Sequence, residues 1–211
     1  MTKLVSDREE MVRTQIEQRG IDDLALLAAF RAVPREQFVS PELAAVAYAD
    51  RPLPIECGQT ISQPYIVALT IAAAGIGPGD RVLEVGAGSG YAAAVIGQVA
   101  GQVIGIERHG ELASTAAARM ARLGYDNVEI VEGDGTRGWP EAAPYDAIVA
   151  AASGTRVPDA LIEQLKPGGR LVMPLGGQWG AQKLIKLTKH EDGSTSREHL
   201  AFVQFVPLIE P

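Results

Sequence analysis

The sequence predicts an α/β fold with a doubly wound, mostly parallel sheet of seven strands. Three observations favour it. From Arg81 onward, short apolar segments of strand length alternate with helical patterns, which is typical of a parallel sheet with helices on both faces. A glycine-rich turn joins the first of these strands to a helix. The last two apolar segments have only a polar turn between them, which indicates a C-terminal antiparallel hairpin at the sheet edge. The expected strands are 81–85, 102–106, 127–131, 145–151, 169–174, 183–188 and 200–206, and the expected helices are 90–99, 110–123 and 158–165.

The N-terminal part of the chain predicts a helical cap. Apolar residues recur at helical spacing over residues 7–30, with Gly20 as an interruption. Residues 47–63 are expected to be irregular because Pro52 and Pro54 exclude a regular helix there. We therefore expect a cap, 1–63, packed on a core domain, 64–211, as one structural unit.

Composition limits the possible functions. The net charge of -7 argues against a general nucleic-acid-binding protein. No apolar segment has the roughly 18 residues that a membrane span needs, and residues 1–13 lack a signal-peptide core. Cys57 is the only cysteine, and the histidines (His109, His190 and His199) have no metal-ligand spacing. These features predict a cytoplasmic protein with no nucleic-acid, membrane or metal partner.

The turn after the first strand of the sheet is the strongest motif. Strand 81–85 runs into Gly86, Gly88 and Gly90, and a helical pattern starts at Tyr91. This order lets a nucleotide-like ligand lie against bare backbone at a helix start. Tyr91 stands where the dinucleotide fingerprint has its third glycine, and the lysine of a phosphate-binding P-loop is missing. The alternative is an ordinary strand-to-helix turn with incidental glycines.

Acidic residues follow the next two strands. Glu107 ends the second strand, and Asp134 lies between Gly133 and Gly135 after the third. The carboxyl ends of parallel strands meet at one sheet edge, where ligands bind. Glu107 could accept hydrogen bonds from ribose hydroxyls, and Asp134 could bind near an adenine amino group, although Asp134 alone could be a plain turn residue. A ribose without a pyrophosphate on the helix start fits S-adenosylmethionine.

A second polar motif, 58–64, precedes an apolar helix. Ser62 could be the helix N-cap, with Pro64 in the first turn, and its hydroxyl could also bind a carboxylate. These two roles are compatible. The sequence has no serine-hydrolase elbow, since the glycine motif reads G-x-G-S-G. Methyl transfer to a carboxylate suits such a site, because the acceptor is already an anion and needs no strong base.

Residues 58–64, followed by 83–91, strongly resemble the protein-L-isoaspartate (D-aspartate) O-methyltransferase family. The likeness covers nearly the whole chain and continues through 33–39, 48–55, 133–135 and 167–171. The resemblance implies a Rossmann-like methyltransferase sheet. It also implies methyl transfer from S-adenosyl-L-methionine to the α-carboxylate of L-isoaspartyl residues in damaged proteins and peptides, with S-adenosyl-L-homocysteine as product. The ester then collapses to a succinimide, and hydrolysis returns some L-aspartyl residues.

The resemblance also implies the site residues. Ser62 would be the catalytic hydroxyl near the acceptor carboxylate, and Ile61, Ser62 and Gln182 would bind the substrate. The cofactor would be held by Glu84, Gly86, Gly88, Ser89, Gly90, Glu107, Asp134 and Gly135. The enzyme would be a monomer that needs no metal.

The chain departs from the family pattern at two places. Cys57 and Gly58 precede the Gln-Thr-Ile-Ser motif, where many members have His-Gly. Residues 151–155 read Ala-Ala-Ser-Gly-Thr, where many members have Ala-Ala-Ala-Pro. The second change leaves open a tailoring enzyme that methylates aspartate in one peptide. A cofactor-binding module without catalysis is a further alternative, and the intact Ser62 and cofactor positions argue against it.

Overall fold

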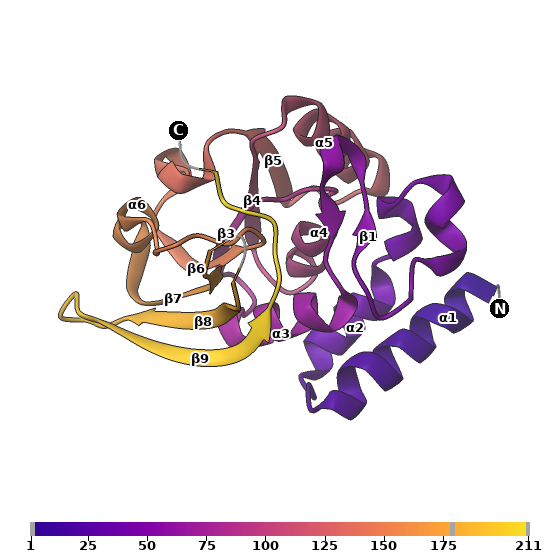
Figure 1. Ribbon diagram of the computed structural model, residues 1–211, viewed down its shortest axis with the longest axis horizontal. Helices are drawn as coiled ribbons and strands as arrows, with labels where there is room; N and C mark the ends of the chain where they lie inside the picture. Colours follow the sequence, from indigo (N-terminus) through magenta and orange to yellow (C-terminus); the bar gives the residue numbers. More distant parts are fainter. Residues whose placement is uncertain (1–2, 178–179, 210–211) are drawn as a thin grey trace.

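The computed structural model describes residues 3–177 and 180–209, and it contains the seven-stranded sheet that the sequence predicts. The strand order is β5-β4-β3-β6-β7-β8-β9. The bounds are β3 Arg81–Val85, β4 Gln102–Glu107, β5 Val128–Glu132, β6 Tyr145–Ala150, β7 Leu165–Leu175, β8 Gln182–Lys189 and β9 Thr195–Val203. Strands β3 to β7 are parallel, and β8 is antiparallel to both β7 and β9. The hairpin β8–β9 extends from one end of the molecule, away from α1 (Figure 1).

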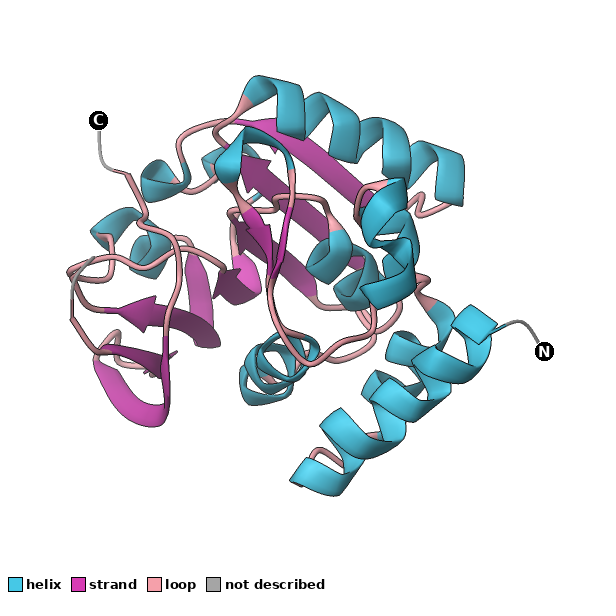
Figure 2. Cartoon of the chain, turned by 45° about the vertical axis from the view of Figure 1, so that its right-hand side comes forward, coloured by secondary structure: helices cyan, strands magenta, loops and turns pink. Residues whose placement is uncertain are grey.

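Helices cover both faces of this sheet (Figure 2). They are α3 Pro64–Ala74, α4 Tyr91–Gly97, α5 Gly110–Leu123 and α6 Asp159–Glu163. Successive strand residues point to opposite faces, so Val82 packs into a cluster with α3, α4 and the N-terminal segment. Its neighbour Leu83 packs into a second cluster, which includes Leu161 of α6. Burial on both faces explains why the central strands β3, β4 and β6 are mostly apolar. Strand β5, at the sheet edge, reads Val-Glu-Ile-Val-Glu and is only partly buried.

The N-terminal segment is helical, as predicted, and it breaks at Gly20. Helix α1, Lys3–Met11, continues through a π turn, Val12–Ile16, and a 3₁₀ turn, Glu17–Arg19. Gly20 then takes a left-handed conformation with φ +89°. Helix α2, Leu24–Ala32, restarts the chain, and the side chain of Asp23 caps it by accepting hydrogen bonds from the backbone of residues 25 and 26. Two 3₁₀ helices follow, Arg35–Phe38 and Pro41–Val46.

Aromatic side chains join the N-terminal segment to the sheet domain. The rings of Phe30 and Phe38 lie 6.3 and 5.4 Å from the ring of Tyr91, the first residue of α4, and both pack edge-on against it. One hydrophobic cluster contains all three residues. This cluster therefore contains residues from both sides of the predicted boundary between cap and core domain, at residues 63 and 64. The boundary itself stays a prediction.

Several segments differ from their predicted form. Strand β7 starts at Leu165, four residues before the predicted residue 169, and the helix expected at 158–165 ends at Glu163. Residues 47–63 contain a short antiparallel ribbon, β1 Leu53–Pro54 with β2 Thr60–Ile61, joined through a 3₁₀ turn, Glu56–Gly58. Each strand of this ribbon has only two residues, and a sequence that contains two prolines gives no sign of so short a strand. Strand β9 starts five residues before the predicted residue 200 and ends at Val203. Residues 195–199 are polar and exposed, yet their backbone still pairs with β8, and pairing rather than apolarity makes a strand at a sheet edge.

Within the described ranges, no helix has both the length and the apolar character needed to cross a membrane.

Candidate active site

The glycine turn lies where the strand order reverses about β3, a usual ligand-binding position in such sheets. Gly86, Gly88 and Gly90 have φ values of +83°, +55° and +85°. This left-handed region is strained for residues with a side chain, so the turn needs glycine at these positions. Gly90 lines none of the pockets described below. A Cβ there would approach Met120 to 2.8 Å, so Gly90 is needed for packing at the start of α4, and its contact with the cofactor stays a prediction.

A pocket of about 260 Å³ opens beside this turn. Gly86, Gly88, Glu107, Asp134 and Gly135 all line it, so the structure brings together the residues predicted from three separate strand ends. Residues 206–209, which follow β9, form another side of the pocket.

Glu107 is buried and holds the backbone on both of its sides. Its Oε2 accepts a hydrogen bond from the N–H of Gly88 at 2.9 Å, and its Oε1 accepts one from the N–H of His109 at 2.9 Å. An ionised carboxylate can accept about four hydrogen bonds. Glu107 therefore keeps acceptor capacity for a pair of ribose hydroxyls while it also anchors the glycine turn.

Asp134 keeps one carboxylate oxygen for a ligand. Its Oδ1 accepts hydrogen bonds from the N–H of Thr136 at 2.9 Å and from the Thr136 hydroxyl at 2.7 Å. Its Oδ2 accepts none from the described residues. This oxygen is available for a donor such as an exocyclic amino group, as the ligand assignment requires.

Two predicted cofactor residues lie deeper. Glu84 is buried with no hydrogen-bond partner for its Oε2 among residues 3–177 and 180–209. Burial, and then the charge of Glu107, raise the pKa of Glu84 to about 8. Ser89 is buried, and its carbonyl accepts a hydrogen bond from Arg119 Nη1 at 2.7 Å. Both residues line a small space that also reaches Ser62.

A second pocket, of about 540 Å³, lies on the other side of Ser62. Its walls are mostly apolar and include Ile66 of α3, Phe202 of β9, and Phe205 beyond β9. Ser62 is half-buried and is not the helix cap, which corrects that interpretation: the N-cap of α3 is Gln63, which makes no side-chain cap bond, with Pro64 in the first turn. The Ser62 hydroxyl makes no hydrogen bond to any described residue, so it remains available to an acceptor carboxylate.

The other two predicted substrate residues, Ile61 and Gln182, are buried and do not line this pocket. Ile61 is buried in β2 and lines the inner space beside the glycine turn. Gln182 is buried, its Nε2 donates to the carbonyl of Phe205 at 3.1 Å, and its Oε1 accepts from the N–H of Phe205 at 2.6 Å. Direct substrate contact by Gln182 stays a prediction. Its hydrogen bonds favour an indirect role, in which it fixes a residue of the pocket wall.

Residues 151–155 differ from the family pattern, but the side chains that differ do not line this second pocket. Ser153 is buried; its hydroxyl donates to the carbonyl of Gly176 at 3.2 Å, and its backbone bonds to Val206 and Leu208. Of these five residues only Ala151 lines the pocket. Ser153 therefore helps to hold the segment after β9 in place, which weakens the reason for considering a different acceptor.

Sequence reasoning missed the segment that separates the two pockets, residues 204–209. It was assigned partly to a strand, but its backbone is held by Gln182 and Ser153. Both pockets share Thr60, Ala151 and Val206, and this is where they meet. No local sequence pattern marks this segment, because its position depends on hydrogen bonds to Gln182 and Ser153, which are distant in the sequence.

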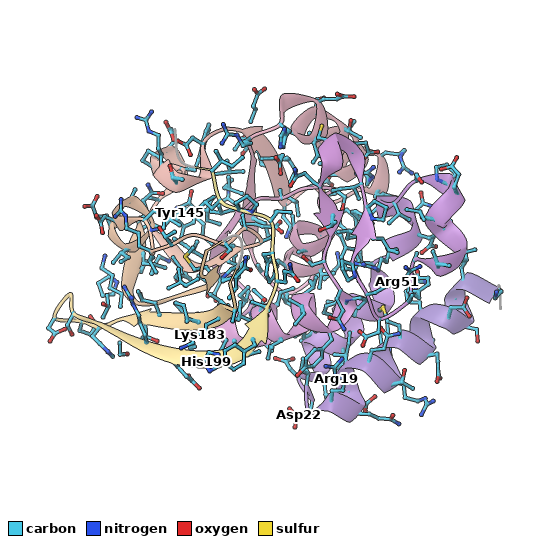
Figure 3. All side chains as sticks on the ribbon, in the orientation of Figure 1. Arg19, Asp22, Arg51, Tyr145, Lys183 and His199 are labelled. Carbon is cyan, nitrogen blue, oxygen red and sulfur yellow. The ribbon has the colours of Figure 1, made fainter. Side chains whose placement is uncertain are left out.

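The second pocket lies between the N-terminal segment and the C-terminal hairpin. Pro52, from the N-terminal segment, and Phe202, from the hairpin, both line it. Arg51 precedes Pro52, and Lys183 is the cross-strand partner of Phe202; Figure 3 shows both side chains on these two parts of the chain. Exposed cations near the pocket favour an anionic substrate on a protein whose net charge is -7.

No group of three or more His, Cys, Asp and Glu side chains among the described residues is arranged to hold a metal ion.

Comparison with known proteins agrees with the geometry. Residues 6–211 match the family model of protein-L-isoaspartate(D-aspartate) O-methyltransferase. The chain belongs to this family. It is 55% identical to protein-L-isoaspartate O-methyltransferase 1 of Rhodopseudomonas palustris strain HaA2, over 99% of this chain and 85% of that protein. It is 51% identical to the protein-L-isoaspartate O-methyltransferase of Methanoculleus marisnigri, over 96% of this chain and 91% of that protein.

Solved structures of protein-L-isoaspartate O-methyltransferases have the same fold. One superposes with a TM-score of 0.85 at 31% identity, covering 95% of this chain and 65% of that chain. Another, a putative family member from Plasmodium falciparum in complex with S-adenosyl-L-homocysteine, gives a TM-score of 0.81 at 27% identity and covers 96% and 98% of the two chains. The match to the family model includes the polar motif at residues 58–64, the glycine turn and the C-terminal hairpin of this chain.

Proposed function

We propose that this protein is a repair methyltransferase that methylates the α-carboxylate of L-isoaspartyl residues in damaged proteins and peptides. Its methyl donor is S-adenosyl-L-methionine, and S-adenosyl-L-homocysteine is released. The ester then forms a succinimide, which hydrolyses partly to L-aspartyl residues. The observation that carries the proposal is the arrangement of two pockets that meet at Thr60, Ala151 and Val206, with Ser62 on the acceptor side.

The first pocket fits the cofactor by its chemistry. The left-handed glycines leave the backbone bare beside it, Glu107 has acceptor capacity for ribose hydroxyls, and the free Oδ2 of Asp134 suits an amino group. The bound cofactor supplies a methyl group that its sulfonium already activates. Glu84, Ser89 and Gly135 complete the proposed set around the turn.

The protein has little proton chemistry to perform. A carboxylate oxygen forms a bond to the methyl carbon as the C–S bond breaks, and the positive and negative charges of the reactants disappear together. A weakly polar pocket favours such a charge-cancelling transfer, since water stabilises the separated charges more than the transition state. Ile66, Phe202 and Phe205 supply apolar walls, and the Ser62 hydroxyl orients the acceptor carboxylate.

The proposal is tested with labelled S-adenosyl-L-methionine and two matched peptides, one isoaspartyl and one aspartyl. Base-labile methylation of the isoaspartyl peptide alone is the expected result. Methylation of neither peptide, with cofactor binding intact, would favour the single-peptide tailoring enzyme instead. Detectable turnover on either peptide would exclude a cofactor-binding module without catalysis.

Replacing Ser62 with alanine is expected to lower kcat by about 10- to 100-fold, the effect of one lost hydrogen bond to a charged group. Cofactor affinity should change by less than about threefold, because Ser62 lies on the acceptor side. Initial rates and calorimetry with S-adenosyl-L-homocysteine measure the two effects. Ser114→Ala, which removes an exposed hydroxyl on α5, is the matched control. Unchanged turnover in Ser62→Ala would refute the assigned role.

We further infer that the enzyme acts as a monomer in the cytoplasm. The single cysteine excludes an internal disulfide and so gives no sign of an oxidising compartment. Size-exclusion chromatography with light scattering would test the monomer, and cell fractionation would test the location.

A further inference from the structure

Arg35 is a fully buried arginine that no role assigned above uses. Its Nε donates to the carbonyl of Ala47 at 2.7 Å, and its Nη2 donates to the carbonyl of Ser62 at 2.8 Å. Its guanidinium carbon lies 4.8 Å from the ring centre of Tyr91. Its Nη1 has no hydrogen-bond partner among the residues that the structure describes.

The charge of Arg35 is not neutralised by a carboxylate. None of the ion pairs among residues 3–177 and 180–209 includes it. Carbonyl dipoles and the face of an aromatic ring stabilise the guanidinium instead. Burying a charge without a counter-ion is costly, and apolar side chains fill such space at lower cost. The buried arginine is therefore better explained by what it contacts than by a contribution to stability.

Those contacts reach both reactant sites. Ser62 lies between the end of β2 and the start of α3, and Gln63, the N-cap, gives no side-chain cap bond that would fix this junction. Arg35 holds the junction directly through the Ser62 carbonyl. Tyr91 directly follows Gly90, so the same guanidinium packs on the end of the glycine turn.

We propose that Arg35 is a positioning residue for methyl transfer: by holding the Ser62 carbonyl, it sets the direction in which the Ser62 hydroxyl meets the acceptor carboxylate. Lysine cannot replace it, because a single ammonium cannot span the two carbonyls as the planar fork does. The proposal rests on the role of Ser62 in the proposed function, and it adds a residue from the N-terminal segment to the reaction.

The test is a pair of variants in the full-length protein, Arg35→Met and Arg35→Lys, assayed with the isoaspartyl peptide. Arg35→Met keeps an unbranched, flexible side chain, although a shorter one, and removes the buried charge. We expect it to melt cooperatively and to bind S-adenosyl-L-homocysteine within about threefold of the wild type, while kcat falls about 10- to 100-fold from misplacement of the hydroxyl. Arg31→Met is the control, since Arg31 lies in the same segment and its ion pairs with described residues are those with Glu9 and Glu17 at the surface.

A double-mutant cycle separates positioning from a general structural effect. In a Ser62→Ala background, the further loss from Arg35→Met should shrink to less than about twofold, because the hydroxyl that it positions is absent. A folded Arg35→Met enzyme with wild-type kcat, or an equal loss with and without Ser62, would overturn the proposal. If Arg35→Met does not fold, Arg35→Lys decides: lowered kcat with intact cofactor binding supports positioning, and unchanged kcat overturns it. A wild-type enzyme that is inactive on the isoaspartyl peptide would overturn the proposed function, and this proposal with it.

Discussion

Replacing Glu107 with alanine is expected to weaken the binding of S-adenosyl-L-homocysteine by about 100-fold or more, close to 3 kcal/mol. The carboxylate has two tasks in the structure. It offers acceptor positions to the ribose hydroxyls, and it accepts hydrogen bonds from the N–H groups of Gly88 and His109. The substitution removes the ligand contacts and also frees the glycine turn that lies along the cofactor. Isothermal titration calorimetry measures the loss directly.

Glu132→Ala provides the matched control. Glu132 ends the adjacent strand β5 and is the register partner of Glu107, but it is exposed and does not line the pocket. We expect its affinity to equal that of the wild type. Glu107→Gln is expected to bind weakly as well, because one amide NH2 would face a backbone N–H. An alanine variant that binds within threefold of the wild type would contradict the ribose assignment.

Glu84 is expected to make the ligand-free protein lose stability as the pH rises. Its pKa in the folded protein, about 8, lies above its ordinary value of 4.5, first because of burial and then because of the charge of Glu107. Between these values the folded protein binds more protons than the unfolded chain, so the free energy of unfolding falls as the pH increases. The full stability contribution is present below pH 4.5 and is lost above pH 8. We expect a loss of about 2–4 kcal/mol, within the limit of about 5 kcal/mol that the interval allows.

Glu84→Gln removes this ionisation with little change in shape. In urea denaturation at pH 5.5 and pH 8, we expect the variant to gain stability over the wild type by about 2–3 kcal/mol more at pH 8 than at pH 5.5. Other titrating groups occur in both proteins and cancel in the difference. A difference between the two proteins that stays constant with pH would contradict the raised pKa. In a Glu107→Ala background the effect should become smaller, because one of its two causes is gone.

The sequence was informative where the fold imposes a local pattern. The parallel strands alternate with helical patterns, and their carboxyl ends must meet at one edge, so the sequence alone places Gly86, Glu107 and Asp134 together. The left-handed turn needs its glycines, and these remain visible in the sequence. Gly20 is likewise visible in the sequence as an interruption of the helical pattern, and it takes a left-handed conformation between the two N-terminal helices.

The sequence was uninformative where a residue acts through distant contacts. Gln182 lies 23 positions from Phe205, and Arg35 lies 27 positions from Ser62, so no periodicity links either pair. The polar start of β9 was missed because its pairing with β8 depends on backbone atoms, which side-chain patterns do not describe. Serine is common at helix N-caps, so the sequence predicts Ser62 as the cap, yet the cap lies one residue later, at Gln63.

Thr60, Ala151 and Val206 line both pockets, so each of them borders the nucleoside on one side and the damaged peptide on the other. These positions are therefore constrained from two directions. A larger side chain at any of them would enter the space of both reactants at once, so they should tolerate less change than positions that line one pocket alone.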